Sequence, residues 1–186
     1  MKNIFFYLIV FLFTMSCAGF KNVDHSTAGL NENNLNKIEG TYNNLPSSGS
    51  GFYVGRLNEV FDRNLEMYNV NKTTEKYDNK NVNLKLRIVN QHTLNVKIYE
   101  AENLLFDQDL KVQLKKDGFL YLKEKRFMLD GIPLILGGWN IQKSRFTIDQ
   151  NNHLKVQSNY FFCNGILIVM SDWKTLHYDL TFEKIQ

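Results

Sequence analysis

The stretch VNLKLRIVNQHTLNVKI, residues 82–98, decides the fold class. Apolar and polar residues alternate on both sides of a turn at residues 90–92, and the apolar set is Val82, Leu84, Leu86, Ile88, Leu94, Val96 and Ile98. Successive side chains of a strand point to opposite faces, so this alternation gives each strand one apolar and one polar face. The stretch therefore predicts two antiparallel strands, covered on one side by a core and open to solvent on the other.

The same period of two residues continues toward the C-terminal end. Further strands are predicted at residues 110–114, 119–123, 145–149, 154–158 and 177–185, with a turn at Asp117-Gly118. Residues 127–139 and 166–170 are apolar on both faces. Pro133 there indicates an edge strand or a bulge, and Gly137-Gly138 indicates a bend.

With an entry strand near residues 35–42, these segments make roughly eight to ten strands, which is typical of an all-β antiparallel barrel or sandwich. One short amphipathic helix is predicted at residues 55–65, because apolar residues recur there near helical spacing. Its outward residues would be Asn58, Glu59, Asp62 and Arg63. We expect almost no helix in residues 82–185.

The alternation also assigns side chains to the core and to the surface. The predicted core positions are Leu84, Leu86, Val96, Ile98, Phe146 and Phe182. By the same rule Lys85, Lys97 and Arg145 should face water.

The N-terminal residues indicate where the protein is delivered. Lys2 precedes an unbroken apolar run at residues 4–13, which is the layout of a secretory signal. The run is shorter than the roughly 20 apolar residues of a membrane span. An uncleaved anchor extended through residues 18–20 is the alternative.

Ser16-Cys17, at the end of this run, resembles the lipobox of bacterial lipoproteins of the Bacteroidota type, with Thr14 and Met15 departing from the usual pattern. The resemblance implies that Cys17 is acylated and that the chain is cut before it. It also implies a place in the cell envelope, at the periplasmic face of the outer membrane. The alternative is a Cys that merely lies near an ordinary cleavage site.

This interpretation divides the chain into a signal peptide at residues 1–16, a lipid-anchored polar tether at 17–36 and one β-rich domain at 37–186. The 170 residues after Ser16 are enough for one domain. The tether is Asn-rich and would hold the domain a few nanometres from the membrane if it were extended. With Cys17 lipidated, Cys163 has no partner for a disulfide within the chain, and it is predicted to be a small buried apolar residue.

The charge of the chain argues against nucleic-acid binding. The formal net charge is +3, and basic residues are scattered through the predicted strands. The densest basic spots are Lys115-Lys116 and residues 123–126, on either side of a turn. They fit a solvated hairpin tip or a patch for a polyanion or lipid headgroups.

The sequence carries no recognisable catalytic motif, and it predicts neither a metal nor a cofactor. We therefore expect a protein that is not an enzyme. The alternative is a secreted hydrolase whose site is assembled from separated residues, with Glu59, Asp62, His153 and His177 as candidates.

Aromatic residues provide the candidate binding site. Trp139, Tyr160 and Phe162 are either ordinary core or the lining of a cavity for a small apolar ligand, which a barrel of about eight strands can hold. Gly40-Thr41-Tyr42 is similar to the G-x-W entry of lipocalins, although Tyr42 replaces the Trp. The resemblance implies a ligand-binding barrel. We thus predict a lipid-anchored envelope protein that binds a small apolar ligand or an envelope protein partner.

Overall fold

The structure is a computed structural model that describes residues 20, 29–62, 77, 81–123, 126–132, 136–166 and 169–185, with the backbone alone at 126–132, 136, 164–166, 169–171 and 173. Cys17 and the predicted signal peptide lie outside these residues. So do Pro133 and the last residues of the predicted helix.

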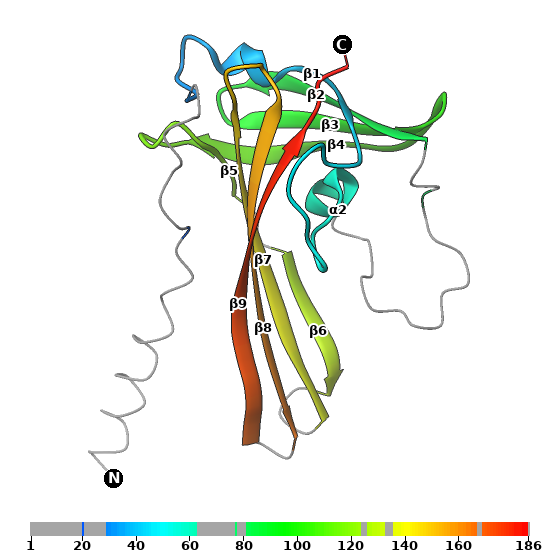
Figure 1. Ribbon diagram of the computed structural model, residues 1–186, viewed down its shortest axis with the longest axis vertical. Helices are drawn as coiled ribbons and strands as arrows, with labels where there is room; N and C mark the ends of the chain where they lie inside the picture. Colours follow the sequence, from blue (N-terminus) through cyan, green and yellow to red (C-terminus); the bar gives the residue numbers. More distant parts are fainter. Residues whose placement is uncertain are drawn as a thin grey trace.

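Nine antiparallel strands form a single sheet (Figure 1). Their order is β1-β2-β3-β4-β5-β7-β8-β9, and β6 pairs with the part of β7 that β5 leaves free. This confirms the predicted all-β class. The bounds are β1 Gly40–Asn43, β2 Val82–Asn90, β3 Thr93–Glu100, β4 Asn103–Leu114, β5 Leu120–Leu122, β6 Arg126–Ile132, β7 Leu136–Ile148, β8 Leu154–Ile166 and β9 Val169–Phe182.

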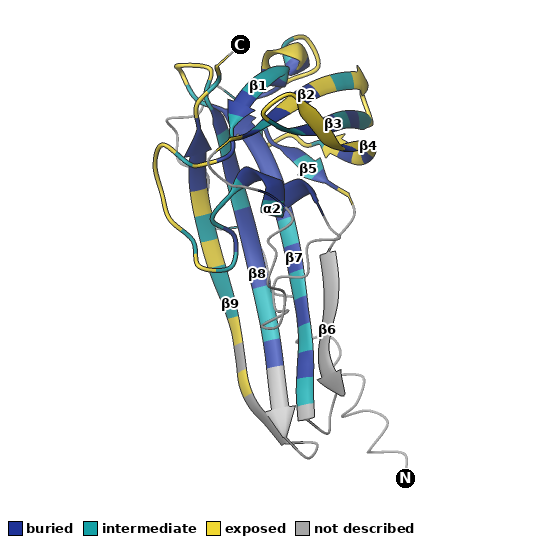
Figure 2. Cartoon of the chain, turned by 90° about the vertical axis from the view of Figure 1, so that its right-hand side faces the viewer, coloured by how far each residue is buried: buried dark blue, intermediate teal, exposed yellow. Residues whose placement is uncertain are grey.

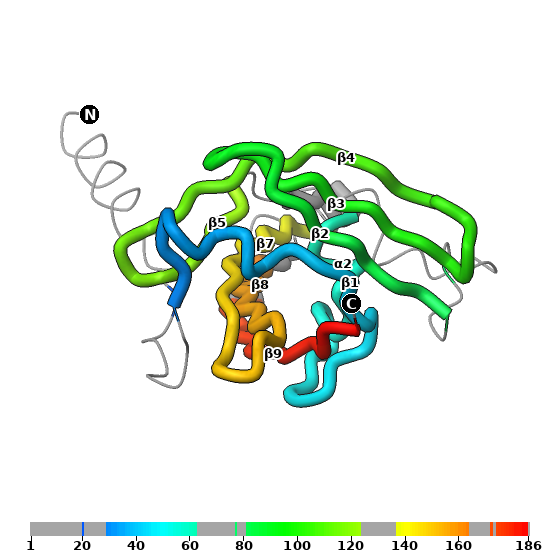
Figure 3. Tube along the Cα trace, turned by 90° about the horizontal axis from the view of Figure 1, so that it is seen from above, coloured from blue at the N-terminus to red at the C-terminus, as the bar shows by residue number. Residues whose placement is uncertain are grey.

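The first strand of this order, β1, meets the residues that follow the last strand, β9. The amide of Asn43 donates to the carbonyl oxygen of Glu183 at 3.1 Å, and the amide of Ile185 donates to that of Thr41 at 2.8 Å. Seen from above, the upper strands curve around a common interior (Figure 3). The upper part is therefore barrel-like, and we call it the barrel. The lower halves of β7, β8 and β9 extend beyond it together with β6 (Figure 1).

The barrel interior is filled by the residues that the alternation assigns to it. Leu84 lies opposite Ile98, and Leu86 lies opposite Val96, on one face of β2 and β3. All six predicted core residues are at most 1% exposed, so this prediction is confirmed. Lys85 is exposed, as predicted, and Lys97 is half-buried.

Arg145 contradicts the predicted surface set. Its side chain is on the outer face of β7, yet it is only 4% exposed. The rings of Phe119 and Phe20 cover its guanidinium at 4.1 and 4.4 Å. Alternation identifies the face on which a side chain lies, but it does not show that other parts of the chain cover that face.

The predicted helix forms as α2, Leu57–Phe61, and it is shorter than residues 55–65. Asn58 and Asp62 were expected to face water, but they are 2% and 0% exposed. The reason is that α2 lies against the inner face of the sheet (Figure 3), where Phe61 stacks on Phe146 with ring centroids 5.1 Å apart. A helix covered on all sides buries its polar residues too.

The chain is already packed upstream of residue 37. Leu30 and Leu35 are buried, and the Leu30 amide donates to the Gly118 carbonyl oxygen at 2.9 Å. Residues 35–38, predicted as part of a strand, form the 3-10 helix η1, Leu35–Ile38. The described part of the predicted tether is therefore attached to the barrel.

Two buried tyrosines predict a loss of stability in alkaline solution. The Tyr42 hydroxyl donates to the Ile38 carbonyl oxygen at 2.9 Å, and the Tyr77 hydroxyl donates to Asp62 at 2.5 Å. Burial raises the pKa of both hydroxyls above the ordinary value of 10.0. In the unfolded chain both ionise near pH 10, so the unfolded state binds fewer protons above that pH and the free energy of unfolding falls.

The measurement is urea unfolding between neutral pH and pH above 10. The double variant Tyr42→Phe, Tyr77→Phe should lose stability less steeply with pH in this range, although it is less stable at neutral pH by about 1 kcal/mol per lost hydrogen bond. An unchanged pH dependence in the variant would contradict the prediction.

Candidate functional site

The inner face of the barrel continues downward along β7, β8 and β9. Pairing places Ser144, Ser158 and Tyr178 in one row, and Gln142, Tyr160 and Leu176 in the next. These rows lie next to the core row that contains Phe146, on the same face of the sheet. The exposure of the long strands changes along their length, from buried at the barrel end to half-buried and exposed below (Figure 2).

The loop between β1 and α2 is hydrogen-bonded to β9. The amide of Ser47 donates to the Thr181 carbonyl oxygen at 2.8 Å, and the Thr181 amide donates back to that of Ser48 at 3.0 Å. Gly49 has a φ of +83°, and a Cβ there would lie 2.2 Å from the carbonyl oxygen of Asp179. Only glycine allows the loop to approach β9 this closely.

The loop carries two aromatic residues onto the strands. Tyr53 stacks on Tyr160 with centroids 4.7 Å apart and ring planes 7° apart, and its ring lies 6.2 Å from that of Phe162. Phe52 meets Tyr53 edge to face at 4.9 Å, and it is 88% exposed. We call Phe52, Tyr53, Tyr160 and Phe162 the aromatic shelf.

Polar side chains are buried beside the shelf. The hydroxyl oxygens of Ser144 and Ser158 lie 2.8 Å apart, and the Gln142 amide nitrogen donates to Ser144 Oγ at 3.5 Å. Gln142 Oε1 is buried, and none of the residues that the structure describes donates a hydrogen bond to it. A buried acceptor of this kind is a place for an ordered water or for a donor group of a ligand.

The structure brings together two of the three predicted ligand-binding residues. Tyr160 and Phe162 lie on one face of β8, two residues apart, and both contact Tyr53. Trp139 lies opposite Cys163, which is on the other face of β8. Tyr160 is fully buried, so it serves as the floor of the shelf.

Cys163 is 1% exposed, as predicted for a small buried apolar residue. Burial raises the pKa of its thiol. A protonated thiol is a poor nucleophile, so this position favours a structural role.

The carboxylates of the hydrolase alternative serve the local structure. Glu59 Oε2 accepts hydrogen bonds from the amides of Gly55 at 2.8 Å and Arg56 at 3.0 Å, which caps the start of α2. Asp62 accepts the hydroxyl of Tyr77. Each of these two carboxylates thus accepts hydrogen bonds that hold the local structure together.

The two histidines of that alternative are also apart. His153 lies at the β7–β8 turn, with Nδ1 3.5 Å from Asp149 Oδ2. His177 Nδ1 lies 2.8 Å from Asn159 Oδ1 on the outer face. Asn159 is six residues beyond His153, about 20 Å along a strand. The four candidates are not brought into one site.

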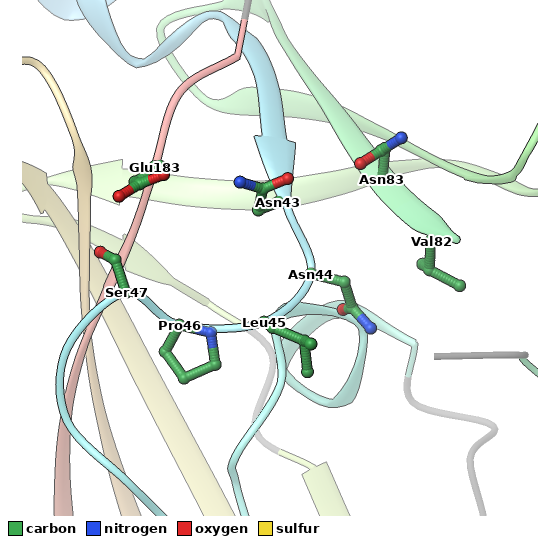
Figure 4. Close-up of a pocket in the computed structure, with 8 residues that line it drawn as sticks. All are labelled: Asn43, Asn44, Leu45, Pro46, Ser47, Val82, Asn83 and Glu183. Atoms are coloured by element: carbon green, nitrogen blue, oxygen red, sulfur yellow. The ribbon is translucent and has the colours of Figure 1, made fainter. Parts of the chain in front are cut away.

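A pocket of about 340 Å³ lies beside the barrel closure (Figure 4). It is lined by Asn43, Asn44, Leu45, Pro46, Ser47, Val82, Asn83 and Glu183. A second pocket, of about 370 Å³, lies between residues 30–35 and the end of β4, where Lys115 and Lys116 border it. None of the shelf residues lines either pocket.

Comparison with known proteins gives no further guidance. No family model matches the sequence, and neither a curated protein nor a solved structure matches it significantly. Within the described ranges, no helix is long and apolar enough to cross a membrane. In that same part of the chain, no group of three or more His, Cys, Asp or Glu side chains is placed to hold a metal ion.

Sequence reasoning missed Phe52 and Tyr53. The signal was present, because two adjacent aromatic residues occur in the Gly- and Ser-rich segment SGSGFYVG, residues 48–55. Large aromatic side chains in such a loop have no period that assigns them to a core. Only the folded chain shows that Tyr53 packs on β8 and leaves Phe52 outside.

Proposed function

We propose that this protein is a lipid-anchored, non-enzymatic component of the bacterial cell envelope that binds an envelope protein partner through the aromatic shelf. The observation that carries the proposal is the 88% exposure of Phe52 on a loop that is hydrogen-bonded to β9. An exposed aromatic ring on a preorganised support is the usual form of an interface anchor.

The packing of the barrel favours a partner over a small ligand. Its interior contains Phe61, Phe146 and Phe182, each 0% exposed. Apolar surface remains accessible on the shelf, where Phe52 is exposed and Phe162 is half-buried. Such a surface suits one apolar side chain of a partner, and a small apolar ligand is the alternative occupant.

The anchor rests on the N-terminal sequence. A short apolar run followed by Ser16-Cys17 supports acylation at Cys17, and the several acyl chains of a lipoprotein each add about 0.8 kcal/mol of membrane affinity per buried methylene. Intact mass of the membrane form tests it. We expect a chain that begins at Cys17 with added acyl mass, and a chain that still begins at Met1 would contradict the anchor.

Photo-crosslinking in intact cells tests the shelf. Benzoylphenylalanine replaces Phe52 in one variant and Leu104 in a matched control, because Leu104 is 47% exposed on β4, away from the shelf. We expect one discrete protein-sized adduct from position 52 and none from position 104. With the purified partner, Phe52→Ala should weaken binding at least about tenfold.

Three other results would contradict the proposal of an envelope protein partner. An added mass of lipid or metabolite size at position 52 would show that the shelf binds a small ligand. Twice the mass of the chain would show contact between two copies. Equal labelling at positions 52 and 104 would show that the shelf has no specific occupant.

A further inference from the structure

Phe20 is docked on the outer face of the barrel, only three residues after Cys17. Its ring lies 4.4 Å from the Arg145 guanidinium and meets the ring of Tyr121 edge to face at 5.6 Å. A cation over the face of an aromatic ring is attracted by it, more strongly where both are shielded from water. Arg145 is shielded, because it is 4% exposed.

This docking limits the distance between the barrel and Cys17. Three residues span at most about 11 Å when fully extended. A lipid on Cys17 would therefore enter the bilayer within about 11 Å of the place where Phe20 docks. This replaces the predicted spacer of some twenty residues by a close attachment at a defined face.

The outer face at this place carries lysines. Gln113, Tyr121 and Arg145 form one row across β4, β5 and β7. Side chains two residues apart on a strand share a face, so this row is bordered by neighbours of the same orientation. Four of these six neighbours are lysines, Lys111, Lys115, Lys123 and Lys143, and the other two are Phe119 and Thr147.

Contacts among these residues support this arrangement. Lys115 Nζ lies 3.8 Å from the centroid of the Tyr121 ring, and the Lys123 amide donates to the Lys111 carbonyl oxygen at 2.9 Å. The carboxylate of Asp117 is bound to Arg145 at 3.0 Å and accepts the hydroxyl of Tyr121. The guanidinium of Arg145 thus neutralises the negative charge of Asp117. The side chains of Lys111, Lys115 and Lys123 are exposed.

We propose that the outer face formed by Lys111, Lys115, Lys123 and Lys143 around Phe20 lies against the membrane and binds anionic lipid headgroups. The proposal rests on the anchor at Cys17 that the proposed function includes. A lysine close to an anionic bilayer strengthens the association about fivefold. The lipid anchor supplies the attachment, and the lysines determine which face of the barrel is turned to the bilayer.

Site-specific fluorescence quenching tests this orientation. The full lipidated protein is placed in vesicles with nitroxide-labelled headgroups, with a fluorophore on Lys116→Cys or, as the distant control, on Leu104→Cys. Leu104 lies seven residues from Lys111 along β4, about 24 Å. Cys163 is 1% exposed, and Cys17 carries lipid on its sulfur, so neither competes for the label.

We expect the label at position 116 to be quenched severalfold more than the label at position 104 in vesicles that contain phosphatidylglycerol. The difference should shrink in pure phosphatidylcholine. It should also shrink in the triple variant Lys111→Glu, Lys115→Glu, Lys123→Glu, which removes a factor of about one hundred in headgroup affinity. Lys85→Glu, Arg87→Glu on β2 reverses two charges instead of three; it is the charge control and should change nothing.

Phe20→Ala should also reduce the difference, because it releases the anchor segment, whereas Phe52→Ala removes a ring elsewhere and should not. Equal quenching at 116 and 104 in a chain whose mass shows the lipid would overturn this orientation and leave the proposed function intact. Quenching at 116 that is the same with and without phosphatidylglycerol would overturn headgroup binding. A chain without acyl mass would overturn both proposals.

Discussion

Leu86→Asp is expected to unfold the domain. Leu86 is 1% exposed on β2 and lies opposite Val96, inside the barrel. An unpaired carboxylate there has no hydrogen-bond partner of opposite charge, and its burial costs several kcal/mol. The whole free energy of unfolding of a domain of this size is only about 5–15 kcal/mol. Far-UV circular dichroism and urea unfolding give the measurement.

Lys85→Glu is the matched control for this prediction. Lys85 is the neighbouring residue on the same strand, but it points to solvent. A substitution on an exposed face away from special contacts changes stability by no more than about 0.5 kcal/mol. A folded Leu86→Asp variant together with an unfolded Lys85→Glu variant would mean that the strand faces are inverted.

The strands and the core could be predicted because one local rule governs both. A residue on a strand shares its face with the residues two positions away, so Leu84 and Leu86 could be assigned to the core together. Pairing with Val96 and Ile98 follows from a tight turn at residues 90–92. The closure of β1 on residues 183–185 has no such local signal, because it joins segments that are far apart in the sequence.

The candidate site was predicted only in part for the same reason. Tyr160 and Phe162 are two residues apart on β8, so they share a face, and both belong to the shelf. Trp139 is on another strand, and its face depends on a register that the sequence does not reveal. The cover of the site, Tyr53 with Phe52, comes from a loop more than a hundred residues away in the chain.

The tether and Arg145 show most clearly that segments far away in the sequence can pack over a face of the sheet. Residues 17–36 are polar and without a period, which is typical of a flexible segment, yet Phe20 and Leu30 each contact the barrel. The alternation assigns Arg145 to the polar face of its strand, yet the residue is buried beneath Phe20 and Phe119. A local sequence pattern does not reveal that a distant segment packs over a residue in this way.

Arg145→Ala is expected to lower the free energy of unfolding by about 2–4 kcal/mol. Nε and Nη2 both donate to Gln157 Oε1, at 2.8 and 2.6 Å. Nη1 donates to Tyr121 Oη at 2.7 Å and lies 3.0 Å from Asp117 Oδ2. Removal of the guanidinium takes its hydrogen bonds from Gln157 Oε1 and Tyr121 Oη and the ion pair from Asp117. Urea unfolding measures the loss.

Two further variants separate charge from geometry at this position. Arg145→Lys keeps the positive charge, but one ammonium group cannot reproduce the planar set of donors that reaches Gln157, Tyr121 and Asp117, so most of the loss should remain. Lys143→Ala, two residues away on the same strand and half-buried, should cost clearly less. A full recovery in Arg145→Lys would mean that the charge alone matters.

A double-mutant cycle links this network to the N-terminal segment. Phe20 contacts the guanidinium directly, so the cost of Phe20→Ala should largely disappear when Arg145 is already alanine, and the coupling should be about 0.5–1 kcal/mol or more. If the two costs simply add, Phe20 is not held by Arg145. The close attachment of Cys17 to the barrel would then have lost the contact on which it rests.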